Sequence, residues 1–324
     1  MPREGNTVRP IVIGLAVAAL SATAAAQAPA TPEQLAEARA AVGDAPARPQ
    51  TLVLADVPRA TGAARALLNG RDLAGWHPWL GYPDPSVTYR DRPGAAPIGT
   101  TRDTAGDFAV RRIEGRPALW VKGETWGALV HEADLRDYHL RLHYRWGAKR
   151  WAPRLGQPPN NGLLYHTHGA PGAVFGTWQP SVEFEIMQGS TGMAVAVGRD
   201  VRLRTTAALD PSLVSPPVRF RQGARPVEIV NGSLIWNVEN ARDAEKPAGQ
   251  WNTLDLYVLG DRAVHVVNGV PVMVVEGLAT VDAEGKRTPL THGSVQLQSE
   301  GAETWFRDIT VEPIDRLPKV VVKE

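Results

Sequence analysis

Short segments in which apolar and polar side chains alternate dominate this sequence. The clearest is YHLRLHYRW, Tyr138–Trp146, where aromatic and leucine residues alternate with histidine and arginine. This alternation is typical of a β-strand with one buried face. No convincing amphipathic helix interrupts the series, so the sequence favours an antiparallel sandwich of two sheets over alternating βα units.

Turn signals separate these segments. The strongest is Asn268-Gly269 between AVHVV and VPVMVV, because this dipeptide readily adopts the positive φ angles that a tight hairpin requires. The other strand-like segments are PALWVK, GALVHE, NGLLYHT, SVEFEIMQ, VEIV, SLIWNV, TLDLYVLG, GSVQLQSE and TWFRDITVEPI.

The beginning of the chain has the features of a secretory signal peptide. Arg3 and Arg9 precede an apolar run, and Ala26-Gln27-Ala28 matches the pattern of a cleavage site. We therefore predict a signal peptide over residues 1–28, cleavage after Ala28, and a periplasmic or secreted product. No later segment reaches the ~20 apolar residues of a transmembrane helix, so we expect no membrane contact after cleavage.

Residues 29–65 are rich in alanine and proline and are predicted to form an N-terminal extension or linker of low order. A short helix is expected at Pro32–Val42, with Thr31 as its N-cap.

Charge and composition exclude several classes of protein. The net charge of +1 gives no electrostatic signature of nucleic-acid binding, so we expect a neutral or small partner. The absence of cysteine excludes disulfides, thiolate metal sites and a cysteine nucleophile. The sequence also lacks a nucleophile elbow, a P-loop and a dinucleotide-binding fingerprint.

One strand carries two acidic residues. Read with a two-residue period, SVEFEIMQ (Ser181–Gln188) places its valine, phenylalanine and isoleucine on one face and Glu183 and Glu185 on the other. The two carboxylates are then roughly 7 Å apart along the strand and repel each other. Either they are solvated surface groups paired with arginines such as Arg141 or Arg145, or they form a functional pair in a groove.

Two histidines lie close by in YHTHG. His166 and His168 share a face by the same period, and they are either surface residues or, together with Glu183, ligands of a divalent cation. The sequence does not establish any cofactor. The one cofactor that it suggests is a divalent metal ion.

Aromatic and amide side chains suited to sugars accompany the acidic strand. The chain has ten tryptophans but only five phenylalanines, and indole rings pack well on pyranose faces. The paired asparagines before Gly162 either bond sugar hydroxyls or form a turn. The residues expected to bind substrate are Trp178, Asn160, Asn161, Gln188, Gln298 and Glu300.

Six blocks together resemble the 3-keto-disaccharide hydrolase family. In order, they are ALLNGRDLAGW, DYHLRLHYRW, NNGLLYHTHG, PSVEFEIMQGSTG, KPAGQWNTLDLYVLGDRAVHVVNGVPV and GSVQLQSEGAETWFRDITVEPI. The resemblance spans residues 66–315 and leaves residues 316–324 as a C-terminal tail. It implies a concanavalin A-like jelly-roll sandwich of two antiparallel sheets and hydrolysis of 3-keto-glycosides. Two positions depart from the family pattern: NNG replaces the usual NSG, and Glu185 replaces a glutamine.

The expected function is that of an exported hydrolase that cleaves 3-keto-glycosides or related glycosides. A ketone at C3 acidifies the proton on C2, so a base can start an elimination that hydration completes. We expect Glu183 to be the base or a metal ligand, Glu185 its partner, and His166 or His168 the acid or a metal ligand. Repulsion between the two carboxylates would raise one pKa and give a stronger base.

The sequence leaves two alternatives to this function. One is a non-catalytic, lectin-like module that binds glycans. The other is a classical retaining glycosidase, but Met187 and Gln188 occupy the place of the third acidic residue in that template. In each case the expected partner is a carbohydrate, and the oligomeric state is undetermined.

Overall fold

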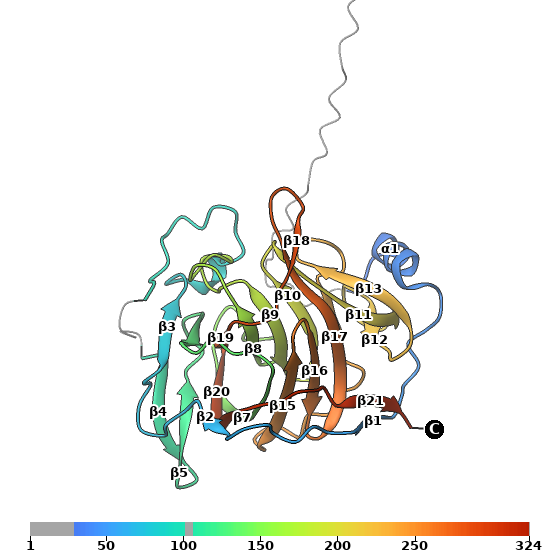
Figure 1. Cartoon of the computed structure of the whole chain (residues 1–324). Helices are drawn as coiled ribbons and strands as arrows, with labels where there is room; N and C mark the ends of the chain where they lie inside the picture. The colour runs from blue at the N-terminus through green and yellow to red at the C-terminus, as the bar shows by residue number, and fades with distance from the viewer. Residues whose placement is uncertain (1–28, 101–105, 324) are drawn as a thin grey trace, which may run out of the picture.

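The computed structural model describes residues 29–100 and 106–323 (Figure 1). The predicted signal peptide therefore lies outside the described residues. The described part contains one α-helix, α1 (Pro32–Val42), and one short 3₁₀ helix, Pro85–Val87. All its other regular elements are strands, joined by turns and loops. No helix among the described residues is long and apolar enough to cross a bilayer.

The strands are β1 (Leu52–Ala55), β2 (Arg65–Ala66), β3 (Trp76–Leu80), β4 (Phe108–Ile113), β5 (Arg116–Val121), β6 (Gly127–His131), β7 (Tyr138–Arg150), β8 (Asn160–Thr167), β9 (Ser181–Met187), β10 (Ala194–Val197), β11 (Val201–Leu209), β12 (Val218–Phe220), β13 (Arg225–Val230), β14 (Asn237–Val238), β15 (Asn252–Leu259), β16 (Arg262–Val267), β17 (Val270–Val281), β18 (Arg287–Pro289), β19 (Ser294–Ser299), β20 (Ala302–Pro313) and β21 (Lys319–Val322).

Two curved antiparallel sheets form the body of the protein (Figure 1). The smaller sheet has seven strands in the order β14-β10-β9-β8-β19-β6-β3. The larger sheet has twelve, with the path β12-β11-β17-β16-β15-β7-β20-β5-β4 and with β13, β18 and β2 paired to its members. The expected all-β class and concanavalin A-like jelly-roll sandwich are confirmed.

The main hydrophobic core lies between the two sheets. Val182, Phe184 and Ile186 of β9 are fully buried in it, as the alternation predicted. Tyr144 and Trp146 of β7 enter the same core from the larger sheet. Burying such side chains contributes roughly 1.5–3 kcal/mol each, so the core fixes which face of each strand points outward.

The predicted hairpin is present between β16 and β17. Asn268 and Gly269 have φ angles of 50° and 79°, and Val267 pairs with Val270 across the turn. Both positive φ angles are those that an Asn-Gly turn supplies at low cost.

The N-terminal extension is folded onto the sandwich, so the expectation of low order is wrong. Thr31 caps α1 as predicted, and Ala38 and Val42 on the helix are buried in the main core. β1 pairs with β21, which places the C-terminal segment in a two-stranded sheet and not in a free tail (Figure 1). Apolar side chains on both segments provide the contacts that a composition rich in alanine and proline did not reveal.

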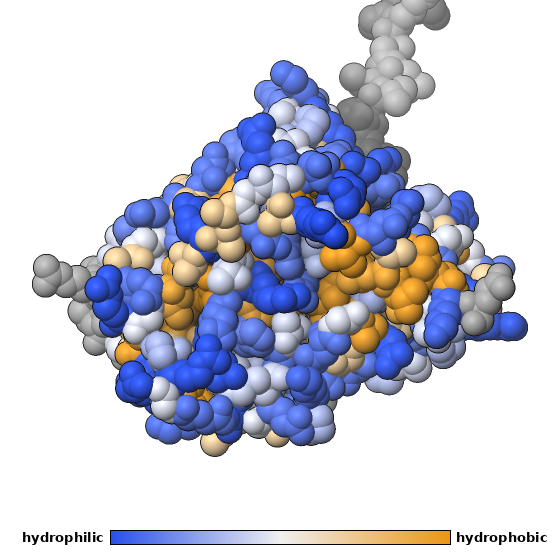
Figure 2. Space-filling model, turned by 60° about the horizontal axis from the view of Figure 1, so that its bottom comes forward, coloured by the Kyte–Doolittle hydropathy of each residue, from blue (hydrophilic) through white to orange (hydrophobic). Residues whose placement is uncertain are grey.

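The surface is mostly polar, with apolar patches. In Figure 2, hydrophobic residues lie in groups between hydrophilic ones on the face turned toward the viewer. Val321 and Val322 of β21 are among the exposed apolar residues. Trp236, in the segment SLIWNV that was expected to form a strand, is also exposed, at 39%. The sequence around it forms a turn before β14 and does not continue as a strand.

Candidate functional site

The outer face of the seven-stranded sheet carries the two acidic residues of β9. Glu183 pairs with Leu164 of β8, and Glu185 pairs with Gly162. Residues paired across antiparallel strands project from the same face, so all four belong to the outer face. The predicted division of β9 into an apolar and an acidic face is confirmed.

This outer face is covered. Glu183 and Glu185 are each only 5% exposed, so the face expected to form an open groove is instead covered. A second apolar cluster surrounds the carboxylates and is formed by Trp126, Ala128, Leu164, Val174, Trp178, Met193, Val195 and Val197.

Two covering segments contribute polar groups that the sequence analysis missed. Arg154, between β7 and β8, forms an ion pair with Glu300, which is 4% exposed. Tyr89, between β3 and β4, donates a hydrogen bond of 3.2 Å from its hydroxyl to Glu300 Oε1. Together with Glu183 and Glu185 these three residues define what we call the acidic chamber. Neither segment shows a periodic pattern, so no local signal placed Arg154 or Tyr89 in a site.

The chamber shifts the ionisation of its carboxyl groups. Burial raises the pKa of Glu183 well above its usual value, and the carboxyls of Glu185 and Glu300 add to this effect. Burial and Glu300 raise the pKa of Glu185 to about 8, although Arg154 opposes the shift. Three carboxyls beside one guanidinium cannot all ionise cheaply, so the glutamate pair retains a proton near neutral pH.

Several buried polar atoms in and around the chamber have no hydrogen-bond partner among the described residues. They are Trp126 Nε1, Arg154 Nε, Asn160 Oδ1, Glu185 Oε1 and Gln298 Oε1. Each such atom costs roughly 1–3 kcal/mol when left unpaired. Their concentration at one place, with donors and acceptors mixed, is typical of a site that binds a polar ligand.

Gly162 leaves space for the acidic side chains. A Cβ at this position would collide with Glu183 Oε1 and Gln298 Oε1, which lie directly over the glycine. Gln298 of β19 lies over Gly162 together with Glu183, and the carboxyl of Glu300 is close enough to raise the pKa of both glutamates. Both residues therefore lie near the acidic pair, although β19 pairs with β8 and not with β9, and their contact with substrate stays a prediction. Asn160 also lies at the chamber, where its amide acts to lower the pKa of Glu185.

His166 does not lie in the chamber, so its predicted place beside Glu183 is wrong. Its φ angle is +51°, and the pairing of β8 with β19 shifts register at this point. This irregularity breaks the two-residue period and directs the ring to the carbonyl oxygen of Gly260, 3.2 Å from Nε2. Burial lowers the pKa of His166 to about 4.

His168 is also separate from the acidic pair. Its Nε2 lies 2.9 Å from Asp200 Oδ2, and its backbone N–H bonds to Pro180, three residues before Glu183. Three residues of strand span about 10 Å. No group of three or more histidine, aspartate or glutamate side chains in the described residues is arranged to hold a metal ion, so the metal site predicted from His168 and Glu183 is not formed.

Two further predicted ligand-binding residues have other roles. Asn161 pairs with Ile186 and faces the core, where its Nδ2 donates to Thr304 Oγ1 over 3.3 Å, so its predicted contact with substrate is wrong. Trp178 is on the expected side but buried, with its Nε1 bonded to Gly127 and its ring stacked 6.2 Å from Trp126. Trp178 is therefore a wall of the chamber and does not offer an exposed platform.

The arginines proposed as partners of the acidic strand lie on the larger sheet. Arg141 pairs with Asp255 and Arg145 with Glu114. The interpretation of Glu183 and Glu185 as surface groups neutralised by these arginines is therefore wrong.

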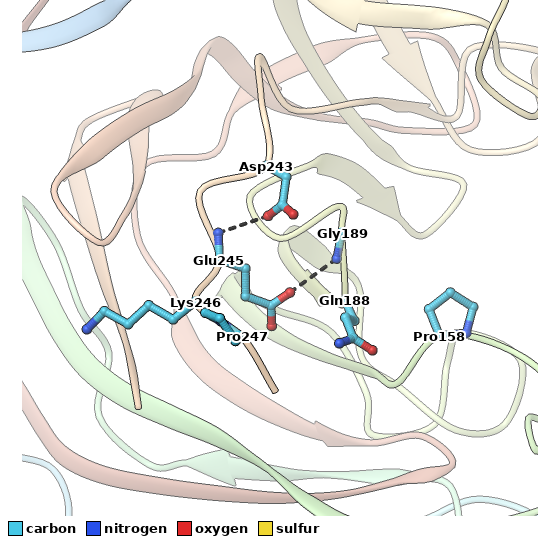
Figure 3. Close-up of a pocket in the computed structure, with 7 residues that line it drawn as sticks. All are labelled: Pro158, Gln188, Gly189, Asp243, Glu245, Lys246 and Pro247. Carbon is cyan, nitrogen blue, oxygen red and sulfur yellow. Dashed lines mark hydrogen bonds between the residues drawn. The ribbon is translucent and has the colours of Figure 1, made fainter. Parts of the chain in front are cut away.

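Gln188 lies just beyond β9, at the rim of a separate hollow of about 440 Å³ (Figure 3). Its lining residues are Pro158, Gln188, Gly189, Asp243, Glu245, Lys246 and Pro247. Glu245 is held there by hydrogen bonds from Tyr144 Oη at 2.8 Å, Trp146 Nε1 at 2.6 Å and Gly189 N at 3.1 Å. These three hydrogen bonds hold the Glu245 side chain in place at the end of the sandwich. Glu245 thereby links β7 to the turn that follows β9, the strand that carries the acidic pair.

The raised pKa of Glu185 predicts a pH-dependent cost in stability. The folded chain keeps the proton on Glu185 up to about pH 8, whereas the unfolded chain releases it near pH 4.3. The stability that this group contributes is therefore complete below about pH 4.3 and is lost as the pH rises to about 8. In urea unfolding, E185Q should be more stable than the wild type by about 2–4 kcal/mol at pH 8.5 and nearly equal to it at pH 4.

The matched control is E276Q, which changes an exposed strand glutamate and should stay within about 0.5 kcal/mol of the wild type at both pH values. Equal stability of E185Q and the wild type at pH 8.5 would show that the chamber does not hold a protonated carboxyl.

Residues 63–312 match the family model described as "3-keto-alpha-glucoside-1,2-lyase-like domain". The chain belongs to this family. The match covers both sheets and every residue of the acidic chamber, so the family assignment expected from the six sequence blocks is confirmed. A comparison with curated proteins found no match.

The solved structures to which this chain is similar are distant in sequence, and their TM-scores are below 0.5. A candidate glycosyl hydrolase from Parabacteroides distasonis is 14% identical, with a TM-score of 0.43 over 78% of this chain and 94% of that one. A galectin-like protein of unknown function from Bacillus subtilis is 10% identical, with a TM-score of 0.43 over 80% and 99%. The β-glucanase of Bacillus licheniformis is 8% identical, with a TM-score of 0.35 over 79% and 100%.

Proposed function

We propose that this member of the 3-keto-alpha-glucoside-1,2-lyase-like family cleaves glycosides that already carry a ketone at C3. The observation that carries the proposal is the acidic chamber: two buried glutamates with raised pKa values, surrounded by unpaired polar atoms. Strongly shifted carboxyls in a covered site are typical of general acid–base catalysis.

The reaction begins with proton abstraction. Glu183 and Glu185 share a proton near neutral pH. In the form that carries this proton on Glu185, the ionised carboxylate of Glu183 takes the C2 proton, which the ketone acidifies, as an enolate forms. The bond between C1 and the aglycone oxygen then breaks, and protonated Glu185 gives its proton to the leaving oxygen. Water adds to C1 of the resulting enone and gives a proton to the Glu185 carboxylate, while Glu183 returns to C2 the proton that it took. The sum is hydrolysis, and the acid that sequence reasoning assigned to His166 or His168 is supplied by Glu185.

The developing enolate oxygen needs hydrogen-bond donors. Arg154 Nε and Trp126 Nε1 are both buried and have no partner among the described residues. Donors of this kind, fixed in a site of low dielectric, stabilise negative charge as it forms. The guanidinium of Arg154 also balances part of the negative charge of the three carboxyls.

Access to the chamber requires movement of the covering segments. Because both glutamates are 5% exposed, a sugar reaches them only when the segments that bear Tyr89 and Arg154 open. Closure over the substrate then excludes bulk water and strengthens the electrostatic interactions inside.

The proposal includes export to the periplasm or the exterior, on the strength of the signal-peptide pattern at residues 1–28. The mature chain would begin at Pro29 and consist of the extension, the jelly-roll unit over residues 66–315 and the C-terminal segment 316–324. The mass of the exported protein locates its N-terminus and so tests the predicted export and cleavage separately.

A comparison of two substrates tests the proposed activity. The purified protein is incubated with a disaccharide and with its 3-keto form, and released sugar is measured. Release from the keto form alone supports the proposal. Release from both indicates an ordinary glycosidase, and binding without release indicates a lectin-like module; either result rejects it.

A further inference from the structure

Phe175 combines two features that are rarely found together. It lies in the segment between β8 and β9, has a φ angle of +53° and is 43% exposed. The left-handed region of φ is unfavourable for a bulky side chain, and an exposed phenylalanine does not gain the stability that burial of its ring would give. Strained positions of this kind concentrate where a side chain has to be presented to a ligand.

The surrounding segment holds the strained conformation in place. Val174 and Trp178 bond to each other through both backbone N–H groups at 3.0 Å, which closes a short loop around Phe175. Thr177 Oγ1 donates to the carbonyl oxygen of Phe175 at 3.1 Å. Gly176 lies so close to Tyr82 that a Cβ would collide with the phenol. The loop is thus packed tightly on its inner side while the Phe175 ring remains exposed.

The exposed ring continues the aromatic wall of the chamber. The ring centroid of Phe175 lies 5.1 Å from that of Tyr89 in an edge-to-face contact. The hydroxyl of Tyr89 bonds to Glu300, and its ring lies 6.1 Å from that of Trp178. A continuous set of aromatic residues therefore leads from the buried carboxyls to the protein surface and ends at Phe175.

We infer that Phe175 is a stacking subsite for a second pyranose ring, which lies outside the chamber while the keto-sugar ring is inside. The ligand class is a glycoside with at least two sugar units, whose C–H face packs on the phenyl ring. Phe175 thereby takes the role of exposed platform that the sequence suggested for Trp178. The inference rests on the proposed function, because that proposal places the reacting ring in the chamber.

The test compares F175G, F175W and the wild type on two substrates, a 3-keto-disaccharide and a methyl 3-keto-glucoside. For the disaccharide, F175G should raise KM about tenfold with kcat nearly unchanged, and F175W should retain the wild-type KM. For the methyl glycoside, which has no second ring, all three proteins should give the same KM. An unchanged KM of F175G for the disaccharide would overturn the inference.

Thermal unfolding distinguishes a binding role from a structural one. Glycine tolerates positive φ, so F175G should be at least as stable as the wild type in spite of the lost ring. A clear loss of stability, with equal loss of activity on both substrates, would mean that Phe175 only supports Tyr89. W236L removes another exposed aromatic ring and serves as a matched control that should leave both KM values unchanged.

Binding measurements separate this inference from the proposed function. The unmodified disaccharide is titrated into the wild type and F175G by calorimetry. If neither keto substrate is cleaved but F175G binds the disaccharide about tenfold more weakly, the stacking subsite stands and the proposed activity fails. If cleavage depends on Glu183 but the two proteins bind the disaccharide equally, the activity stands and the subsite fails.

Discussion

Replacing Glu183 by glutamine should lower kcat/KM on a 3-keto-disaccharide by roughly 10²–10⁴-fold, because an amide cannot accept the C2 proton. Glutamine has almost the same shape as glutamate, so the side chain can still occupy the space above Gly162. The fold should be preserved. At pH 8 the variant should even be more stable than the wild type, because it no longer carries a buried carboxyl whose pKa is raised.

Steady-state kinetics and calorimetry together check this prediction. E183Q should bind the 3-keto-disaccharide with a Kd close to that of the wild type while its turnover is lost. E276Q, an exposed strand glutamate changed in the same way, should keep full activity. Turnover by E183Q within a few-fold of the wild-type rate would rule out Glu183 as the base.

Replacing Arg154 by methionine should destabilise the protein by about 3–5 kcal/mol at pH 8, because Glu300 then remains buried without its partner. Glu183 and Glu185 lose the same counter-charge, since Arg154 acts to lower the pKa of both. The loss should be smaller at pH 5, where Glu183 and Glu185, whose pKa values are raised, carry protons and need less counter-charge.

Urea unfolding at the two pH values measures this effect. R154K keeps the charge without the forked geometry and should lie between R154M and the wild type. R145M breaks a more exposed ion pair with Glu114 on the other sheet and should cost less than about 1 kcal/mol. A similar, small cost for R154M and R145M at pH 8 would show that the chamber needs no buried counter-charge.

The sandwich was predictable because its signals are local. Alternation in β7 and β9 identifies their buried faces, and the Asn268-Gly269 turn fixes a hairpin register through backbone geometry alone. The position of Glu183 and Glu185 on one outer face follows from the same period.

The composition of the site was less predictable, for two physical reasons. A single irregular residue, His166, reverses the alternation of β8 near its end, and no local residue pattern marks it. Arg154 and Tyr89 reach Glu300 from segments without periodicity, and their positions depend on how those segments fold over the sheet. An open groove was expected because the strand pattern does not reveal the loops that cover Glu183 and Glu185.

Glu185 stands where the resemblance to the family implies a glutamine. The usual glutamine would remove one of the three carboxyls and with it part of the repulsion that raises the pKa of Glu183. E185Q therefore restores the family residue and removes the acid of the proposed mechanism at the same time. Gain in stability with loss of turnover is the combination that this account requires.

The most direct test of the acidic chamber is a crystal structure of E183Q soaked with a 3-keto-disaccharide. The account predicts a sugar ring beneath the segments bearing Tyr89 and Arg154, with C2 next to the residue 183 amide and the ketone oxygen within hydrogen-bond distance of Arg154 Nε. Sugar bound only elsewhere, for example in the hollow beside Gln188 and Glu245, with the chamber closed, would contradict it.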